Sequence, residues 1–317
     1  MTRPCDGRGT GRGGFTLVEL LVSVTVGLLV LISALGFAVS AFQGVDGNKA
    51  REDVYRNVRF IGMTLQRDLQ TTGVGIESEV SFGTLNVFND TVVSLHVPWD
   101  PPAYAYEIDP PTGTTNPLPP GGTCGATCID LQKQPDGTFD LRAGDLARLQ
   151  VNGERRLVLL TEVKDMGSTA QVTFSPDSTL LHLEAAFAGG LQLDRTQTFV
   201  QKLQPVVYWM KDHVLYRADR FDTSGELVGS PMAWDVQDWQ ATILFVDGGE
   251  ADAVNPYDTS DHTDDYDDLL GVRVTARLGA GHVDRRVNDG ELFTRSAEWR
   301  LVPRNLTYAR NRSKTAS

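Results

Sequence analysis

Residues 13–19 read Gly-Gly-Phe-Thr-Leu-Val-Glu, and the run that follows, from residue 20 to residue 45, holds no ionisable side chain. A helix over this run is about 39 Å long, which exceeds the roughly 30 Å hydrocarbon core of a bilayer. The run therefore predicts a membrane-spanning helix. Glu19 at its start needs an explanation, because an unpaired carboxylate in lipid costs several kcal/mol.

The segment before this helix, residues 1–14, is short and basic, with three arginines against one aspartate. Positive charge favours the cytoplasmic side of a membrane. A secretory signal is cleaved at small residues after its apolar run, whereas here Gly13 and Gly14 precede the run. Cleavage after Gly14 would leave the membrane helix on the mature chain. The alternative is an uncleaved signal anchor, in which Glu19 has no use.

The leader, the Gly-Phe junction, the position of Glu19 and the apolar run together resemble the N-terminus of the type IV pilin superfamily. That superfamily includes pilins, minor pilins and type II secretion pseudopilins. The resemblance implies that a prepilin peptidase cuts between Gly14 and Phe15 and methylates Phe15. It also implies that Glu19, the fifth residue of the mature chain, pairs with the N-terminal amine of a neighbouring subunit.

The same resemblance implies where the protein lies and what it meets. We expect a single-pass inner-membrane protein with a periplasmic C-terminal domain that enters a pilus after assembly. The expected partners are the prepilin peptidase, other minor and major pilins, the inner-membrane assembly platform and the membrane itself. The alternative within the superfamily is a subunit of a type II secretion filament.

The formal net charge of −12 argues against direct nucleic-acid binding, which favours basic surfaces. The chain also lacks the Gly-x-Ser-x-Gly, His-Glu-x-x-His and P-loop motifs. We therefore expect a structural protein without catalysis of its own and without catalytic residues. A third reading, from another class, is a membrane-anchored ligand-binding protein.

Beyond the apolar run, a helical pattern continues in amphipathic form. Val54, Val58, Ile61, Leu65 and Leu69 share one helical face, and two glycines at positions 73 and 75 follow. The pattern predicts one helix over residues 15–72, apolar to about residue 45 and amphipathic after it. Residues 46–48, Asp-Gly-Asn, predict a soft point between the two halves.

Residues 73–303 predict a β-rich periplasmic domain, so the expected fold class is α+β, with the long helix packed on that domain. Alternating or β-branched runs bounded by Asp-Gly or Asn-Gly pairs are typical of strands and hairpins. These runs cover residues 80–88, 91–97, 146–151, 156–163, 171–174, 198–203, 206–210, 213–217, 241–246, 272–278 and 293–301. The proline-rich residues 98–122 predict an exposed excursion. Residues 304–317 predict a flexible tail.

Three segments near the C-terminus resemble PilW-type minor pilins and J-class pseudopilins: residues 236–248, 271–277 and 300–306. Their order implies a strand, a loop, a second strand and a closing strand that ends near an Arg-Asn pair. The chain is long for a J-class pseudopilin. The resemblance therefore favours a PilW-like minor pilin that assembles or primes a type IV pilus.

Two further sets of residues are candidates for covalent or metal chemistry. Cys124 and Cys128 form an even pair in an exported domain, which favours a disulfide over a zinc site. The acidic loop offers hard oxygen ligands for calcium, although a solvated loop without metal is the alternative. Its carboxylates are Asp258, Asp261, Asp264, Asp265, Asp267 and Asp268.

Overall fold

The computed structural model describes residues 16–76, 78, 82–99, 102–108, 128–151, 154–174, 199–254, 265–281 and 291–307. These residues form one long helix, α1 (Leu17–Leu69), followed by short and long antiparallel strands. The strands are β1 (Leu85–Phe88), β2 (Thr91–His96), β3 (Ala105–Glu107), β4 (Cys128–Gln132), β5 (Leu146–Val151), β6 (Glu154–Asp165), β7 (Thr169–Phe174), β8 (Phe199–Lys211), β9 (Val214–Phe221), β10 (Leu227–Ala233), β11 (Val236–Phe245), β12 (Glu250–Ala251), β13 (Leu269–Gly279) and β14 (Thr294–Leu301).

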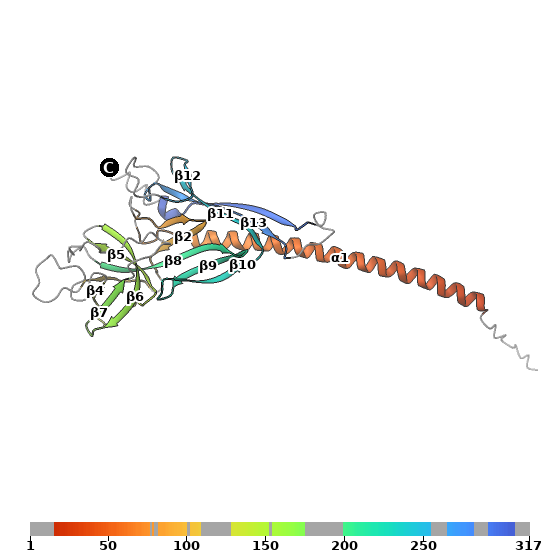
Figure 1. The fold of residues 1–317 in the computed structure, drawn as a ribbon, viewed down its shortest axis with the longest axis horizontal. Coiled ribbons are helices and arrows are strands. Elements are labelled where there is room, and N and C mark those ends of the chain that lie inside the picture. The colour runs from red at the N-terminus through yellow and green to blue at the C-terminus, as the bar shows by residue number, and fades with distance from the viewer. Residues whose placement is uncertain are drawn as a thin grey trace, which may run out of the picture.

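The helix α1 is continuous from the apolar run to the β-rich domain (Figure 1). The helix continues through residues 46–48, since a single glycine costs a helix only about 1 kcal/mol. The soft point expected there stays a prediction. The helix ends at Leu69, and Gly73 and Gly75 then adopt positive φ of 75° and 73° in the turn that follows. Only glycine adopts this conformation freely, so the predicted stop is confirmed.

The described strands of the domain form two antiparallel sheets. The larger has the path β1-β2-β8-β5-β6-β7-β4, with β3, β9 and β10 attached through β8 and β9. The smaller has the order β12-β11-β13-β14. The hairpin turn between β1 and β2 joins them, because Asp90 accepts hydrogen bonds from Trp239 Nε1 at 2.8 Å and from Ala241 N at 3.1 Å.

The amphipathic half of α1 packs between these sheets, while the apolar half projects beyond the domain (Figure 1). Ile61, Leu65 and Leu69 share a core with Tyr208 of β8 and Trp239 of β11. A second core lies among the strands from β3 to β8, and a third involves the other face of β2 and β8. The predicted α+β fold, a long N-terminal helix on a β-rich domain, is confirmed.

Each predicted run overlaps a strand, but two runs are one element. Residues 198–203 and 206–210 both belong to β8, which continues through Pro205. Pro205 removes no hydrogen bond between β8 and β2, because Leu95, the residue opposite it, does not donate to β8. The N–H of Leu95 donates instead to Thr84 O, on the side of β2 that faces away from β8. On the β9 side, pairing begins only at Val207. Proline is thus tolerated at a position without a ladder hydrogen bond.

The proline-rich residues differ from the prediction where the structure describes them. Residues 105–107 form β3, which pairs with β8, and Tyr106 is only 1% exposed. Its hydroxyl donates to Asp140 Oδ1 at 2.6 Å. An exposed excursion is therefore wrong for this part, because one aromatic side chain buries enough apolar area to fix a short strand. Residues 109–127 lie outside the described residues.

Besides β3, three strands lie outside the predicted runs: β4, β10 and β12. In β10, Gly229 and Pro231 interrupt the apolar alternation, and bulges break its pairing with β9. Strand β4 has only 5 residues, which is too few for an alternating apolar pattern to be recognised. Past Pro303 the chain continues as a helical turn over residues 304–307, in which Leu306 is buried and Asn305 Nδ2 donates to Thr72 O at 3.1 Å. Asn305 and Leu306 pack against the end of α1.

Candidate functional site

The N-terminal end of α1 is built around Thr16 and Glu19. Thr16 is the N-cap, and its Oγ1 accepts a hydrogen bond from Glu19 N at 3.3 Å. In return, Glu19 Oε2 accepts from Thr16 N at 3.0 Å and from Thr16 Oγ1 at 3.1 Å. This reciprocal capping box satisfies backbone donors that the first helical turn leaves open. It also places a carboxylate at the positive end of the helix dipole.

The capping box holds the carboxylate of Glu19 in place through only one of its two oxygens. Both hydrogen bonds go to Oε2, and within the described residues Glu19 Oε1 accepts none. A carboxylate offers about four lone-pair sites, so Oε1 remains able to bind a cation of another chain. Gly14 and Phe15, the predicted cleavage residues, lie outside the described residues. The described chain begins directly after them, at Thr16.

The apolar half of α1 has the length and composition of a membrane span. Residues Leu17–Phe42 have a mean hydropathy of 2.5, and none of this segment is buried against the domain. Its hydroxyls bond to helix carbonyls, for example Ser23 Oγ to Glu19 O at 2.7 Å and Ser33 Oγ to Leu29 O at 2.9 Å. Polar groups satisfied inside the helix are compatible with lipid. The helix fits a single-pass membrane anchor with the rest of the chain outside.

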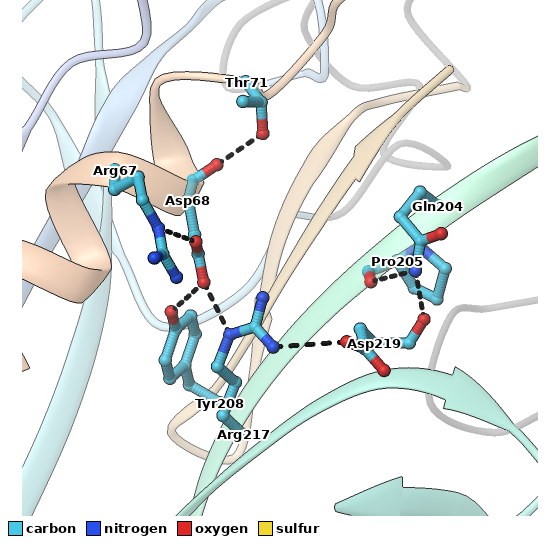
Figure 2. A network of polar contacts seen from close by, with 8 residues as sticks. All are labelled: Arg67, Asp68, Thr71, Gln204, Pro205, Tyr208, Arg217 and Asp219. Carbon is cyan, nitrogen blue, oxygen red and sulfur yellow. Dashed lines mark hydrogen bonds and ion pairs between the residues drawn. The ribbon is translucent and has the colours of Figure 1, made fainter. Parts of the chain in front are cut away.

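The other end of α1 is fastened to the larger sheet by a buried carboxylate, Asp68 (Figure 2). Asp68 Oδ2 accepts hydrogen bonds from Tyr208 OH at 2.5 Å and from Arg217 Nε at 2.6 Å. Asp68 Oδ1 accepts from Arg67 Nε at 3.0 Å. The helix is thereby tied to β8 and β9 through one side chain.

The electrostatics of this network favour the ionised carboxylate. Burial by itself would raise the pKa of Asp68, but the hydrogen bonds from Tyr208 and Arg217 and the charge of Arg217 outweigh burial and hold that pKa below its usual value. Burial and the hydrogen bond to Asp68 raise the pKa of Tyr208. The phenol therefore stays a donor, and Asp68 stays an acceptor, across the physiological range.

The role of Asp68 was not predicted from the sequence, although the helical pattern contains a signal for it. Asp68 lies on the buried face, between Leu65 and Leu69, where a carboxylate is rarely left without a partner. Nothing in the pattern names Tyr208 and Arg217, which lie 140 and 149 residues away in the chain. The pairing of β8 with β9 brings these two partners together.

A second set of contacts fastens α1 to β14, nearer the membrane helix. The guanidinium of Arg295 lies 4.7 Å from the ring centre of Tyr55, and that of Arg51 lies 5.6 Å from the ring of Phe293. Further along, Trp299 packs on Gly62 so closely that a Cβ there would lie 2.3 Å from Trp299 Nε1. The absence of a side chain at position 62 is what lets β14 approach the helix.

The predicted disulfide lies partly outside the described residues. Cys128 opens β4, is buried and is disulfide-bonded. Cys124 is not among the described residues, so its pairing with Cys128 stays a prediction.

The predicted calcium loop is also only partly described. Asp258, Asp261 and Asp264 lie outside the described residues, whereas Asp265 is buried and Asp267 is exposed. Asp268 N donates to Asp265 O at 3.1 Å, and Val246 N donates to Asp268 O. Across the described ranges, no group of three or more potential metal ligands converges. The calcium site therefore stays a prediction.

Comparison with known protein families finds the prokaryotic N-terminal methylation motif over residues 10–35. The match covers the end of the leader from residue 10, the Gly14-Phe15 junction, Glu19 and the apolar helix as far as residue 35. No curated protein matches the chain. The motif and the apolar helix that carries it support a type IV pilin-like or pseudopilin protein, anchored in the membrane and processed by a prepilin peptidase.

Proposed function

We propose that this protein is a minor pilin of the PilW-like kind, which takes part in assembling or priming a type IV pilus and has no catalytic activity. The observation that carries the proposal is the methylation motif placed on a helix that is apolar over residues Leu17–Phe42. The same helix runs without interruption into the core of a β-rich domain. A subunit of this shape can be held in the inner membrane and later be moved as one body.

The proposal assigns separate roles to the parts of the chain. The leader keeps the N-terminus cytoplasmic until the peptidase removes it after Gly14. The periplasmic domain is carried on α1 through Asp68 and through the contacts of β14 with Tyr55 and Gly62. Glu19 then receives the positive amine of a neighbouring subunit. In low dielectric, such a pair is far more favourable than either charge alone.

Processing is tested by the intact mass and N-terminal sequence of the membrane-extracted protein, from cells with and without the prepilin peptidase. We expect a chain that begins at methylated Phe15 only when the peptidase is present. A Gly14→Val variant is the matched control and should keep its leader in both strains. A wild-type chain that still carries residues 1–14 in both strains would make an uncleaved anchor the better reading.

The assembly role of Glu19 is separated from its capping role by Glu19→Gln. A glutamine at N3 still accepts the hydrogen bond of the capping box, so the start of the helix should be kept while the charge is lost. We expect loss of pilus assembly, counted as surface pili by electron microscopy, with membrane levels of the protein unchanged. Thr16→Ala is the converse control: it removes the cap, at about 1 kcal/mol, and keeps the charge. Normal piliation with Glu19→Gln would contradict the proposed pairing.

A subunit of a type II secretion filament is the second candidate, because the methylation motif serves both kinds of assembly. The two functions predict different phenotypes for a deletion of this gene. Loss of surface pili with normal export of secreted enzymes favours the minor pilin. Loss of export with normal pili favours the pseudopilin.

A further inference from the structure

Two arginines and two aromatic residues form a cluster where α1 enters the β-rich domain. We call this cluster the basic clamp, and it consists of Arg51 and Tyr55 of α1, Phe293 just before β14, and Arg295 of β14. The guanidinium of Arg51 lies 5.6 Å from the ring centre of Phe293, and that of Arg295 lies 4.7 Å from the ring centre of Tyr55. The two ring centres are 6.4 Å apart, so the four side chains form one contiguous unit.

The stacked arginines keep donors for a ligand. A guanidinium packs on an aromatic ring through its flat face, which leaves the N–H groups around its edge available. Arg295 Nη1 donates to Tyr55 OH at 3.3 Å, and Arg51 and Arg295 are both exposed. Neither arginine forms an ion pair with a residue that the structure describes. Guanidinium groups held in this way are suited to binding the oxygens of a phosphate group.

The carboxylates around the basic clamp do not neutralise it. Asp53 pairs with Arg56 at 2.8 Å, and Glu298 pairs with Arg300 at 3.0 Å. Two further carboxylates are exposed and bond to neither arginine of the clamp within the described ranges: Glu52 and Glu291. The clamp therefore carries two positive charges without a carboxylate partner in the described part of the chain, although the net charge of the whole chain is −12.

The basic clamp lies close to the level at which lipid headgroups are expected. The run without ionisable side chains ends at residue 45, and Arg51 follows six residues later, about 9 Å further along the helix. The headgroup layer adds roughly 5 to 8 Å on each side of the hydrocarbon core. Arginine side chains extend toward this layer by snorkelling, and tyrosine is enriched there. From the clamp, β14 runs along α1 away from the membrane helix, as far as Gly62.

We propose that the basic clamp binds the phosphate headgroup of an anionic phospholipid in the leaflet from which α1 emerges. Arg51 and Arg295 supply the charge and the donors, while Tyr55 and Phe293 hold the two guanidiniums in place. Because one arginine comes from α1 and the other from β14, a bound headgroup would also tie the start of β14 to the membrane surface. Binding requires the membrane anchor but neither cleavage nor assembly, so it goes beyond the proposed function.

The test is native mass spectrometry of the full chain in detergent, titrated with phosphatidylglycerol or with phosphatidylcholine in ammonium acetate. Both lipids carry a phosphate group, but phosphatidylcholine neutralises it with its own ammonium group. The spectra resolve each bound lipid and give the affinity of the first one. Arg51→Gln with Arg295→Gln removes both charges of the clamp. Arg142→Gln with Arg220→Gln is the matched control, since it removes two exposed arginines elsewhere in the domain.

We expect wild type to bind its first phosphatidylglycerol about fivefold more tightly than its first phosphatidylcholine, since each exposed arginine contributes modestly to binding an anionic headgroup. The clamp variant should bind the two lipids about equally, whereas the control variant should keep the preference of wild type. Ammonium phosphate in place of ammonium acetate, at the same ionic strength, should leave the bound phosphatidylglycerol in place. The comparison of the two lipids on wild type does not depend on the folding of any variant.

Three outcomes would overturn the inference. Equal affinity of wild type for the two lipids would mean that the clamp does not recognise an anionic headgroup. An equal loss of preference in the control variant would assign the effect to net charge and not to the clamp. Displacement of the lipid by ammonium phosphate would make soluble phosphate the ligand. A protein that is cleaved at Gly14-Phe15 but shows no lipid preference overturns this inference alone, whereas an uncleaved protein that keeps the preference overturns only the proposed function.

Discussion

Replacing Asp68 by alanine is expected to lower the free energy of unfolding of the β-rich domain by about 3 to 5 kcal/mol, the cost of breaking a buried charge network from one side. The variant leaves Arg217 partly buried without its carboxylate and deprives the Tyr208 hydroxyl of its acceptor. The measurement is chemical denaturation of the full chain in detergent, followed by the near-ultraviolet signal of the domain's aromatic residues. A loss below 1 kcal/mol would mean that the network does not fasten the helix.

Asp53→Ala is the matched control, because Asp53 also pairs with an arginine of α1 but does so on the surface. Its side chain and that of Arg56 are largely exposed, so the pair is expected to contribute at most about 1 kcal/mol. Both variants remove one carboxylate from the same helix. The difference between them therefore measures what burial adds to the Asp68 network.

The pH dependence of stability follows from the depressed pKa of Asp68. A carboxyl with a lower pKa in the folded than in the unfolded chain stabilises the fold above its unfolded pKa, near 4. This contribution is lost as the pH falls through the folded pKa. The difference in stability between wild type and Asp68→Ala should thus shrink as the pH falls below 4. Denaturation curves between pH 2.5 and pH 7 measure it, and a constant difference down to pH 2.5 would contradict the ionised network.

Replacing Gly62 by alanine is expected to destabilise the domain by about 1 to 3 kcal/mol, although alanine is the better helix former. The new methyl group would lie 2.3 Å from Trp299 Nε1, so β14 must move away from α1 or the indole must leave its rotamer. Thermal unfolding of the full chain in detergent gives the change. The adjacent strand pairing, Val274 with Trp299, should be disturbed first.

A double-mutant cycle isolates this contact from the propensity of the helix. In a Trp299→Ala background the obstacle is gone, so Gly62→Ala should become neutral or stabilising by up to about 1 kcal/mol. The reversal of sign is the result expected of a steric contact. If Gly62→Ala destabilises both backgrounds equally, the cost lies in the helix itself and not in the approach of β14.

The helix and the sheets differ in how far the sequence predicts them. The apolar run and the 3.6-residue pattern from Val54 to Leu69 predict α1 nearly to the residue, because both are local signals. Alternation also locates most strands, including β5 and β13. It misses β10, where Gly229 and Pro231 hide the pattern, and β3, which a single buried tyrosine holds against β8. In both cases the pairing with a neighbour outweighs the local preference.

The residues of the candidate site also differ in how far the sequence predicts them. Gly14, Phe15 and Glu19 follow from a motif of contiguous residues, and the sequence also contains the capping box of Thr16 and Glu19. The 3.6-residue pattern from Val54 to Leu69 also predicts which face of the amphipathic half is buried. It does not predict the strands that cover this face.

By itself, the sequence determined the membrane helix, the processing motif and the α+β class, since each depends on composition or on spacing within a few turns. Tertiary structure alone decided how the domain is attached to that helix. Asp68 meets Tyr208 and Arg217 only because β8 and β9 pair across the end of α1, and Trp299 reaches Gly62 only because β14 closes the smaller sheet. These contacts join residues more than a hundred positions apart, and their geometry is set by sheet pairing, which no local pattern encodes.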